Sequence, residues 1–295
     1  MNVYFLPGMG IFGGIKVGFQ FADALAAAGV RVAVATPDAL APTWLRSMTP
    51  PIDRDAALAG LRRDDVALFS LPQDYPVLKA TPARLVFHCQ GTASEIDAIL
   101  ADPTVTVLTC WDQARGYAKQ HGRRSINVGI GISEAFFYDG MPKYRNTASF
   151  MPRRGAAIVA DVARSLPGLD FVAIDGRHED DAAHIMKRSL AYLATSIGEW
   201  FGLPALEAMA AGCVVVSVPV LGGREYLHPN HNCLVAEPAD FPEVVKRLMS
   251  RDASALRDRL RRQAMATAAG YSLSRHRQAV ARAVTSDLGK VLSWT

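Results

Sequence analysis

Short apolar runs that alternate with amphipathic helical stretches constrain the fold of this chain more than any other feature of its sequence. In the first half of the chain these runs lie at residues 3–6, 30–35, 66–69, 85–87 and 105–109. Such runs are typical of strands that a parallel sheet buries on both faces. Between the first two runs, Val17, Phe21 and Leu25 share one helical face, and Gly29 is placed to end the helix. This half is therefore predicted to be an α/β domain.

The same alternation starts again after a polar, turn-rich stretch at residues 138–146. Strand-like runs then follow at residues 148–151, 171–174, 192–195, 213–218 and 233–235. With 295 residues, half of them hydrophobic, the chain can bury two cores. We predict two Rossmann-like domains with parallel sheets, residues 1–140 and 141–273. Helical patterns at 253–268 and 274–291 end the chain, and we expect the terminal helix, within residues 274–295, to pack on the first domain.

Charge, cysteine content and hydropathy argue against several classes of protein. The formal net charge of +4 is far from the dense basic field of a dedicated nucleic-acid-binding protein. The cysteines form no CxxC pair and have no metal-ligand spacing with histidine, so we expect reduced, buried thiols and no zinc site. Because we find neither a secretory leader nor an apolar run near the roughly 20 residues of a membrane span, we expect a cytoplasmic protein.

The most informative segment is GEWFGLPALEAMAAG, residues 198–212. Pro204 suits the first position of a short helix, and Gly212 suits the position just past its end. The backbone N–H groups of Gly202, Leu203 and Ala205 would then lack partners within the helix. Because the positive end of the helix dipole lies there too, this loop is predicted to bind an anion such as a diphosphate.

Two glutamates flank this anion site. Glu207, expected in the first turn of the helix, could accept two hydroxyl hydrogen bonds, as the diol of a ribose requires. Glu199 lies in the loop itself, nearer the bound group. The plainer alternative is that Glu207 only complements the helix dipole and that Glu199 is a solvated charge.

The wider segment EWFGLPALEAMAAGCVVVSVPVLGGREYL resembles the donor-site signature of glycosyltransferase family 4, part of the group 1 glycosyltransferases. The resemblance covers the E-x7-E pair and the GG-x-E turn at Gly222, Gly223 and Glu225. It implies a GT-B fold, with two Rossmann-like domains whose parallel sheets face a central cleft, and sugar transfer mostly with retention of configuration. It also places Glu199 by the transferred sugar and Glu207 on the nucleotide ribose.

One residue of the segment departs from the family pattern. Trp200 stands where relatives commonly have glycine. A bulky indole beside the sugar would narrow the choice of donor or close the cleft.

Two arginines follow the first predicted strand of the second half and precede a helix. From this position Arg153 and Arg154 can reach phosphate oxygens with bidentate geometry. They resemble the strand-end arginine and lysine of the same family, whose charges neutralise the leaving nucleoside diphosphate without a metal ion. Here the spacing is compressed and arginine replaces lysine. A solvated basic turn is the alternative interpretation.

The N-terminal stretch PGMGIFGGIKVGF places glycines between a strand and a helix. It is not a clean GxGxxG, and no acidic residue is well placed as a ribose partner at the end of the second strand, where Asp38 follows Pro37. Both points disfavour a nicotinamide-dependent dehydrogenase. The resemblance instead implies that Gly13 and Gly14 lie near the transferred group. Lys16 is expected either to contact phosphate or to be solvated.

His88 ends a predicted strand, where it could orient a sugar hydroxyl as a catalytic-site residue. A structural role is the alternative, with Gln90 as another polar contact. No histidine has metal spacing with another histidine or with a cysteine, so no metal is expected to be required.

These features together predict a glycosyltransferase that uses a nucleoside diphosphate sugar as donor and requires no further cofactor. A cell-surface glycan or its lipid-linked precursor is the first expectation for the acceptor, and a nucleic-acid base or a secondary metabolite is the second. A non-catalytic nucleotide-sugar-binding protein and an epimerase of the same fold are also compatible with the sequence. An arginine-rich helical stretch at residues 257–262 is compatible with peripheral contact at the inner face of a membrane, with contact to nucleic acid, or with a plain solvated face.

Overall fold

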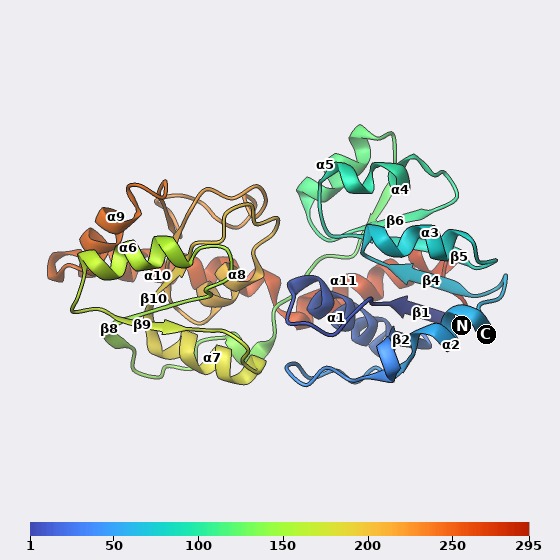
Figure 1. Cartoon of the computed structure of the whole chain (residues 1–295), viewed down its shortest axis with the longest axis horizontal. Helices are drawn as coiled ribbons and strands as arrows, with labels where there is room; N and C mark the ends of the chain where they lie inside the picture. The colour runs from blue at the N-terminus through green and yellow to red at the C-terminus, as the bar shows by residue number, and fades with distance from the viewer. Residues whose placement is uncertain (295) are drawn as a thin grey trace. The chain divides into compact units, whose positions relative to one another are not determined.

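The computed structural model describes residues 1–294 and divides them into two compact units, each built on one parallel sheet (Figure 1). Unit 1 is Met1–Gly131 together with the C-terminal segment from Leu273, and unit 2 is Ile132–Ser272. The predicted α/β class with two parallel sheets is confirmed. The division falls nine residues before the expected boundary at residue 140, since 131 is the last residue of the first stretch of unit 1.

The sheet of unit 1 has seven strands in the order β3-β2-β1-β4-β5-β6-β7. Its strands are β1 (Asn2–Phe5), β2 (Val32–Thr36), β3 (Pro51–Asp53), β4 (Val66–Phe69), β5 (Arg84–Cys89), β6 (Thr106–Thr109) and β7 (Ser125–Asn127). Its α-helices are α1 (Gly13–Ala27), α2 (Arg54–Gly60), α3 (Tyr75–Lys79), α4 (Asp97–Ala101), α5 (Asp112–Gln120) and α11 (Leu273–Val284). The expected terminal helix is therefore shorter than predicted, because α11 ends at Val284 and only a 3-10 turn (Leu288–Lys290) follows.

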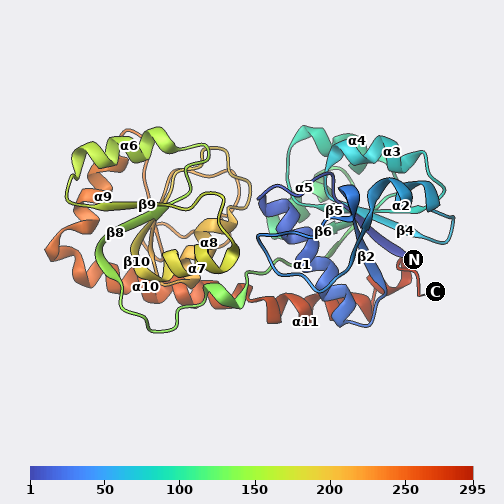
Figure 2. The same cartoon turned by 60° about the horizontal axis from the view of Figure 1, so that its bottom comes forward.

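Two helices far apart in the sequence cover one face of this sheet. In Figures 1 and 2, α11 lies beside α1, with which it is in contact. Tyr4, Val34 and Leu68 occupy the same level of three neighbouring strands and belong to one buried apolar cluster with Phe19 and Val280 of the two helices. The C-terminal segment thus completes the core of unit 1.

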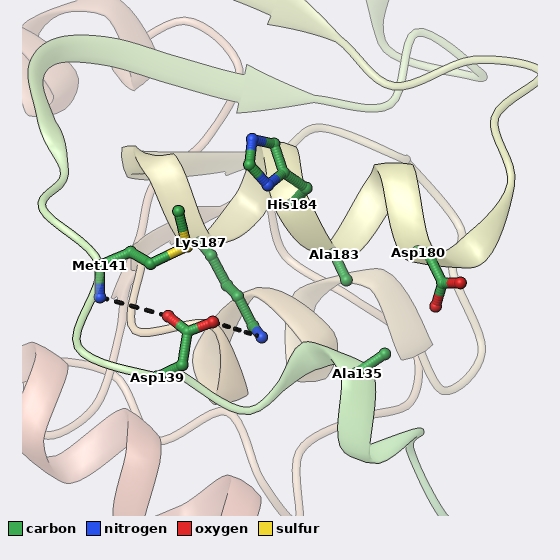
Figure 3. A pocket seen from close by; sticks show the side chains of 7 residues that line it. All are labelled: Ala135, Asp139, Met141, Asp180, Ala183, His184 and Lys187. Carbon is green, nitrogen blue, oxygen red and sulfur yellow. Dashed lines mark hydrogen bonds and ion pairs between the residues drawn. The ribbon is translucent and has the colours of Figure 1, made fainter.

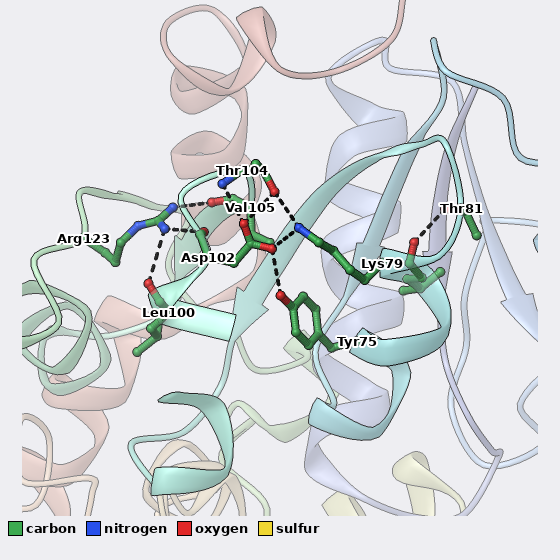
Figure 4. A network of polar contacts seen from close by, with 9 residues as sticks. Tyr75, Lys79, Thr81, Leu100, Asp102, Thr104, Val105 and Arg123 are labelled. Carbon is green, nitrogen blue, oxygen red and sulfur yellow. Dashed lines mark hydrogen bonds and ion pairs between the residues drawn. The ribbon is translucent and has the colours of Figure 1, made fainter. Parts of the chain in front are cut away.

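A network of polar contacts ties three connections of unit 1 together (Figure 4). Asp102 accepts hydrogen bonds from the Tyr75 hydroxyl at 2.7 Å and from the Thr104 backbone N–H at 2.9 Å, and it pairs with Lys79. Burial raises the pKa of Asp102, but the hydrogen bonds from Lys79, Thr104 and Tyr75 outweigh burial and hold it well below its usual range. Arg123 donates to the backbone carbonyl oxygens of Leu100, Asp102 and Val105. These contacts join α3 and the connection from α5 to β7 to the connection from α4 to β6.

The sheet of unit 2 has five strands in the order β12-β11-β10-β8-β9. Its strands are β8 (Tyr144–Phe150), β9 (Asp170–Ala173), β10 (Ser189–Ala194), β11 (Val214–Ser217) and β12 (Leu234–Val235). Its α-helices are α6 (Ala156–Ser165), α7 (Glu179–Arg188), α8 (Leu203–Ala210), α9 (Phe241–Met249) and α10 (Ser254–Ala268). The composition of residues 138–146 suggested a linker throughout. Because β8 begins at Tyr144, the end of this stretch belongs to a strand instead.

The arginine-rich stretch of α10 is used inside unit 2. Arg257 donates at 2.6 Å to the carbonyl oxygens of Leu248 and Ser250, at the end of α9. Arg259 and Arg261 donate to carbonyl oxygens of Asn230 and Gly212, at 2.8 and 2.7 Å. Arg257 and Arg261 are thus partly buried against backbone carbonyls, whereas Arg259 and Arg262 are exposed, as expected of a solvated basic face. No helix within residues 1–294 is both long enough and apolar enough to cross a membrane.

Candidate functional site

Three loops of unit 2 meet at one edge of its sheet. They follow β8, β10 and β11 and comprise residues 151–155, 195–202 and 218–223. The three strands are parallel neighbours, so their carboxyl ends lie at the same edge. The first two loops are joined directly, because the Ser196 hydroxyl donates to the Arg153 carbonyl at 3.0 Å and Ile197 N–H donates to the Arg154 carbonyl at 3.4 Å.

The second and third loops pack backbone against backbone. The N–H groups of Leu221 and Gly222 both donate to the Glu199 carbonyl at 3.2 Å. A Cβ on Gly222 would lie 1.2 Å from the Trp200 carbonyl oxygen, so only glycine fits there. The glycine pair of the GG-x-E turn thus permits the close approach of the loop that carries Glu199, while the Trp200 side chain is half-buried.

We call residues 198–202, which lead into α8, the entry loop. Gly202 precedes the helix with φ +79°, and Gly212 follows it with φ +70°, as expected of the segment. The structure corrects two details of the prediction. Pro204 is the second residue of α8, not the first, and the Ala205 N–H donates to the Gly202 carbonyl at 3.0 Å.

The N–H groups of Gly202 and Leu203 are therefore the donors that the start of α8 offers. No side chain caps the helix there. Orphan N–H groups together with the positive end of the helix dipole favour an anion. The predicted diphosphate site thus keeps two of its three expected N–H donors, those of Gly202 and Leu203.

Arg154 and Glu199 face each other across two of the loops. The Arg154 Nη2 atom lies 3.8 Å from Glu199 Oε2, and the two side chains are 54% and 29% exposed. Arg154 has φ +57°, an uncommon conformation for a residue with a side chain. Arg153 is also exposed, in the same loop, directly before α6. A cation and a carboxylate that remain accessible can both contact a ligand.

Glu207 is 4% exposed and is the fifth residue of α8. It lies in the second turn of the helix, which corrects the expected place in the first. Burial above all, and the nearby carboxylates of Glu207 and Glu199, raise the pKa of Tyr192, whose side chain is buried on β10. Glu207 is therefore a buried carboxylate close to Tyr192.

A depression opens between these loops. Its lining residues, mostly apolar, are Met151, Tyr192, Ala194, Ser196, Glu199, Gly202, Pro204, Ala205, Ser217, Val220, Tyr226 and Leu227. Glu199 and the start of α8 thus share one surface.

A second hollow of unit 2, of about 260 Å³, lies elsewhere (Figure 3). It is lined by Ala135, Asp139, Met141, Asp180, Ala183, His184 and Lys187. Lys187 pairs with Asp139 at 3.0 Å, and this hydrogen bond holds the pKa of Asp139 below its usual value. None of the site residues predicted from the sequence lines this hollow.

The predicted residues of unit 1 are not all at its surface. Gly13 and Gly14 are the first two residues of α1, and Gly13 is exposed. A Cβ on Gly14 would lie 3.1 Å from Gln90 Oε1, so Gln90 and the start of α1 are neighbours. Lys16 is only 6% exposed, which corrects the alternative that it is solvated.

His88 lies in the interior of unit 1, not at a ligand-facing sheet edge as expected. Its side chain is fully buried, with Nδ1 2.9 Å from the Tyr4 hydroxyl and Nε2 3.0 Å from Cys110 Sγ. Burial, and to a lesser extent the charge of His276, lowers the pKa of His88 to about 3. The Gln90 amide donates to the same Tyr4 hydroxyl at 3.3 Å, so His88 reaches the Gln90 side chain only through Tyr4.

The four cysteines are buried, and no disulfide joins cysteines in the part of the chain that the structure describes. Residues 1–294 also contain no group of three or more His, Cys, Asp or Glu side chains that could hold a metal ion.

Sequence reasoning missed Tyr226. The donor-site segment includes this residue, but its sequence pattern predicted no role for it. The structure buries it fully and directs its hydroxyl at the entry loop. Its aromatic side chain directly after the GG-x-E turn was the available signal.

Residues 169–268 match the family described as glycosyl transferases group 1. The expected resemblance to group 1 is thereby confirmed for this segment, which includes Glu199, Gly202, Leu203 and Glu207 but not the two arginines or the predicted residues of unit 1. No sequence among the curated proteins matches the chain.

Several solved structures are similar to the whole chain. HepE from Anabaena, in complex with UDP-glucose, is 13% identical with a TM-score of 0.70, covering 97% of this chain and 99% of that one. Sucrose-phosphate synthase from Thermosynechococcus elongatus is 14% identical with a TM-score of 0.72, covering 98% and 99%. A glycosyltransferase from Rickettsia africae is 12% identical with a TM-score of 0.65, covering 100% and 99%. The GT-B fold that the sequence predicted is confirmed.

Proposed function

We propose that this chain, a GT-B protein with a group 1 glycosyltransferase segment, transfers a sugar from a nucleoside diphosphate sugar to an acceptor. The observation that carries the proposal is the convergence of Arg154, Glu199 and the uncapped start of α8 at one sheet edge of unit 2. A cation, an anion-binding helix end and a carboxylate are the groups that a diphosphate sugar requires.

The diphosphate is proposed to accept hydrogen bonds from the N–H groups of Gly202 and Leu203, and from the guanidinium groups of Arg153 and Arg154. As the bond to the sugar breaks, negative charge grows on the leaving diphosphate. Fixed donors stabilise that charge where it develops. The resemblance to family 4 supports retention of configuration, and these groups are proposed to act without a metal ion.

The glutamates are proposed to hold the two ends of the donor. Glu207, buried and inward-facing, binds the ribose diol, and Glu199 contacts the transferred sugar. Gly13 and Gly14 are proposed to lie near the transferred group. For His88 we propose a positioning role, because its fully buried ring is out of reach of a ligand at the surface. It would act on Gln90 through the Tyr4 hydroxyl, which both side chains contact.

Uridine is the nucleoside that we propose for the donor, because HepE of the same fold was solved with UDP-glucose. A cell-surface glycan or a lipid-linked precursor is the proposed acceptor. The proposed place of action is the cytoplasm, where such donors are made, with the inner face of the membrane as the site of a lipid-linked acceptor.

The first test is a thermal-shift and donor-hydrolysis screen of nucleotide sugars on the wild type and on Glu207→Gln and Arg153→Ala. A ligand that binds only the folded state raises Tm. We expect a UDP-sugar to raise Tm of the wild type and to bind each variant at least about tenfold more weakly, as loss of a charged hydrogen bond predicts. Glu243→Gln is the matched control, because that glutamate is 77% exposed on α9 and should leave binding unchanged.

The outcomes separate the competing functions. Binding without hydrolysis or transfer to any acceptor would indicate a nucleotide-sugar-binding protein, and a rearranged free nucleotide sugar would indicate an epimerase. If no nucleoside diphosphate or its sugar raises Tm of the folded wild type, the proposed donor site is wrong.

A further inference from the structure

The Tyr226 hydroxyl makes two hydrogen bonds to the backbone of the entry loop. Its side chain is fully buried, and its hydroxyl lies 2.8 Å from the Phe201 carbonyl oxygen and 2.7 Å from the Gly202 carbonyl oxygen. A phenol has one proton, so the two carbonyls share it. The two last peptide groups before α8 are therefore both directed at this hydroxyl.

The Tyr226 ring is itself held in place. It packs against Phe201 with ring centroids 5.2 Å apart and against Tyr271 at 6.2 Å. The Asn232 amide donates to the Tyr226 carbonyl at 2.7 Å and to the Thr267 hydroxyl at 2.9 Å. A ring fixed in this way holds its hydroxyl oxygen in one place.

Peptide geometry gives these two hydrogen bonds a consequence for the outer side of the loop. In a planar trans peptide, the C=O of one residue and the N–H of the next point in opposite directions. The described chain has no cis peptide bond. When Tyr226 holds the carbonyls of Phe201 and Gly202 toward itself, the N–H groups of Gly202 and Leu203 must point away from it.

The backbone at Gly202 depends on the same contact. Gly202 has φ +79°, and a Cβ there would lie 2.9 Å from the Tyr226 hydroxyl oxygen. A side chain at position 202 would thus meet both an unfavourable backbone conformation and a steric clash.

We infer that Tyr226 is a positioning residue for the donor, which turns the Gly202 and Leu203 N–H groups toward the diphosphate. The inference rests on the proposed function, because it assumes that these N–H groups bind the donor's phosphates. Tyr226 itself does not touch the phosphates; it acts through the entry loop.

The test compares UDP with uridine on Tyr226→Phe and on a control, Tyr271→Phe. Both variants keep the aromatic ring and the packing of the cluster. Tyr271→Phe likewise removes one hydroxyl from this aromatic cluster; the Tyr271 hydroxyl lies 3.5 Å from Glu225 Oε1. UDP affinity is measured by calorimetry and uridine affinity by ligand-detected NMR.

We expect Tyr226→Phe to weaken UDP binding about tenfold, as loss of a hydrogen bond that orients charged contacts predicts, and to leave uridine binding unchanged. Tyr271→Phe should change neither affinity. Equal UDP affinity in Tyr226→Phe and the wild type, or an equal loss for uridine, would overturn the inference and leave the proposed function intact. Absence of UDP binding in the wild type would overturn the proposed donor and the inference with it.

Discussion

Two histidines lie buried in unit 1, near one face of its sheet. The rings of His88 and Phe21 are 4.6 Å apart, and Phe21 is also 6.5 Å from the ring of His276 on α11. Burial, which is the largest cause in both, lowers the pKa of His88 to about 3 and that of His276 to about 4. Both side chains are therefore neutral in the folded protein at neutral pH.

This pair predicts that unit 1 loses stability in mild acid. The folded-state pKa values lie below the ordinary value of 6.5, so the unfolded chain takes up protons first as the pH falls. Stability is unaffected above about pH 6.5 and falls below it, down to about pH 4 for the His276 contribution and about pH 3 for the His88 contribution. Each histidine should contribute a loss of about 2 kcal/mol in the free energy of unfolding between pH 7 and pH 5.

The measurement is urea unfolding at several pH values for the wild type and for His276→Gln. Glutamine does not titrate and can still donate a hydrogen bond to the Val128 backbone, as His276 does. The variant should lose about 2 kcal/mol less than the wild type between the two pH values. An identical pH dependence in both proteins would show that His276 is not the source.

At the scale of elements, one lysine holds the ends of two helices of unit 2. The Lys143 Nζ atom lies 2.8 to 3.1 Å from four backbone carbonyl oxygens that share its three protons, those of Met186, Lys187, Ser189 and Ala211. These carbonyls lie at the C-terminal ends of α7 and α8, where the helix dipole favours a positive charge. The segment before β8 is thereby fixed to the two helices.

Replacement of Lys143 by methionine should destabilise unit 2 by about 3 kcal/mol, because several carbonyls lose a charged donor and remain partly buried. Urea unfolding gives the free energy directly. Lys246→Met on α9 is the matched control, since that side chain is 59% exposed and should change stability by less than about 0.5 kcal/mol. Equal effects of the two substitutions would refute the capping role.

Elements with a strong local pattern were predictable from sequence, and those set by distant partners were not. The run VALF was predicted to be a strand at residues 66–69, which are the bounds of β4, because all four side chains are buried. The edge strand β3 was missed because its three residues are only partly buried and begin with proline. Lys143 gave no signal, because its carbonyl partners lie 43 to 68 residues away.

In the candidate site, too, features set by local sequence were predictable and features set by distant partners were not. The α8 segment was readable because its glycines and Pro204 act locally. Whether His88 faced a ligand or the core depended on α1 and α11, which cover that face from opposite ends of the sequence. The role of Tyr226 depended on two carbonyls, those of Phe201 and Gly202, that lie 25 and 24 residues before it.

At the scale of the whole molecule, unit 1 is built from both ends of the chain. Asn2 and Ser293 exchange hydrogen bonds, since the Asn2 amide donates to the Ser293 carbonyl and the Ser293 N–H donates to Asn2 Oδ1, both at 2.8 Å. The core cluster includes Val280, Val284 and Leu292 from the C-terminal segment.

Deletion of residues 273–295 should therefore unfold unit 1 and leave unit 2 folded. The deletion removes one covering of the sheet and exposes apolar residues of α1 and the strands. Limited proteolysis with mass spectrometry should show rapid cleavage within residues 1–131 and a protected fragment near 132–272. Protection of both stretches would contradict the dependence of unit 1 on α11.

The division of unit 1 also bears on the order of folding during synthesis. All residues of unit 2 leave the ribosome before Val280, Val284 and Leu292, which complete the core of unit 1. Domains generally fold as units as the chain emerges, so the second unit in the sequence should become native first. Until the C-terminal segment emerges, one face of the unit 1 sheet is covered by α1 but not by α11, and this is the stage of biogenesis at which we expect a chaperone to be needed.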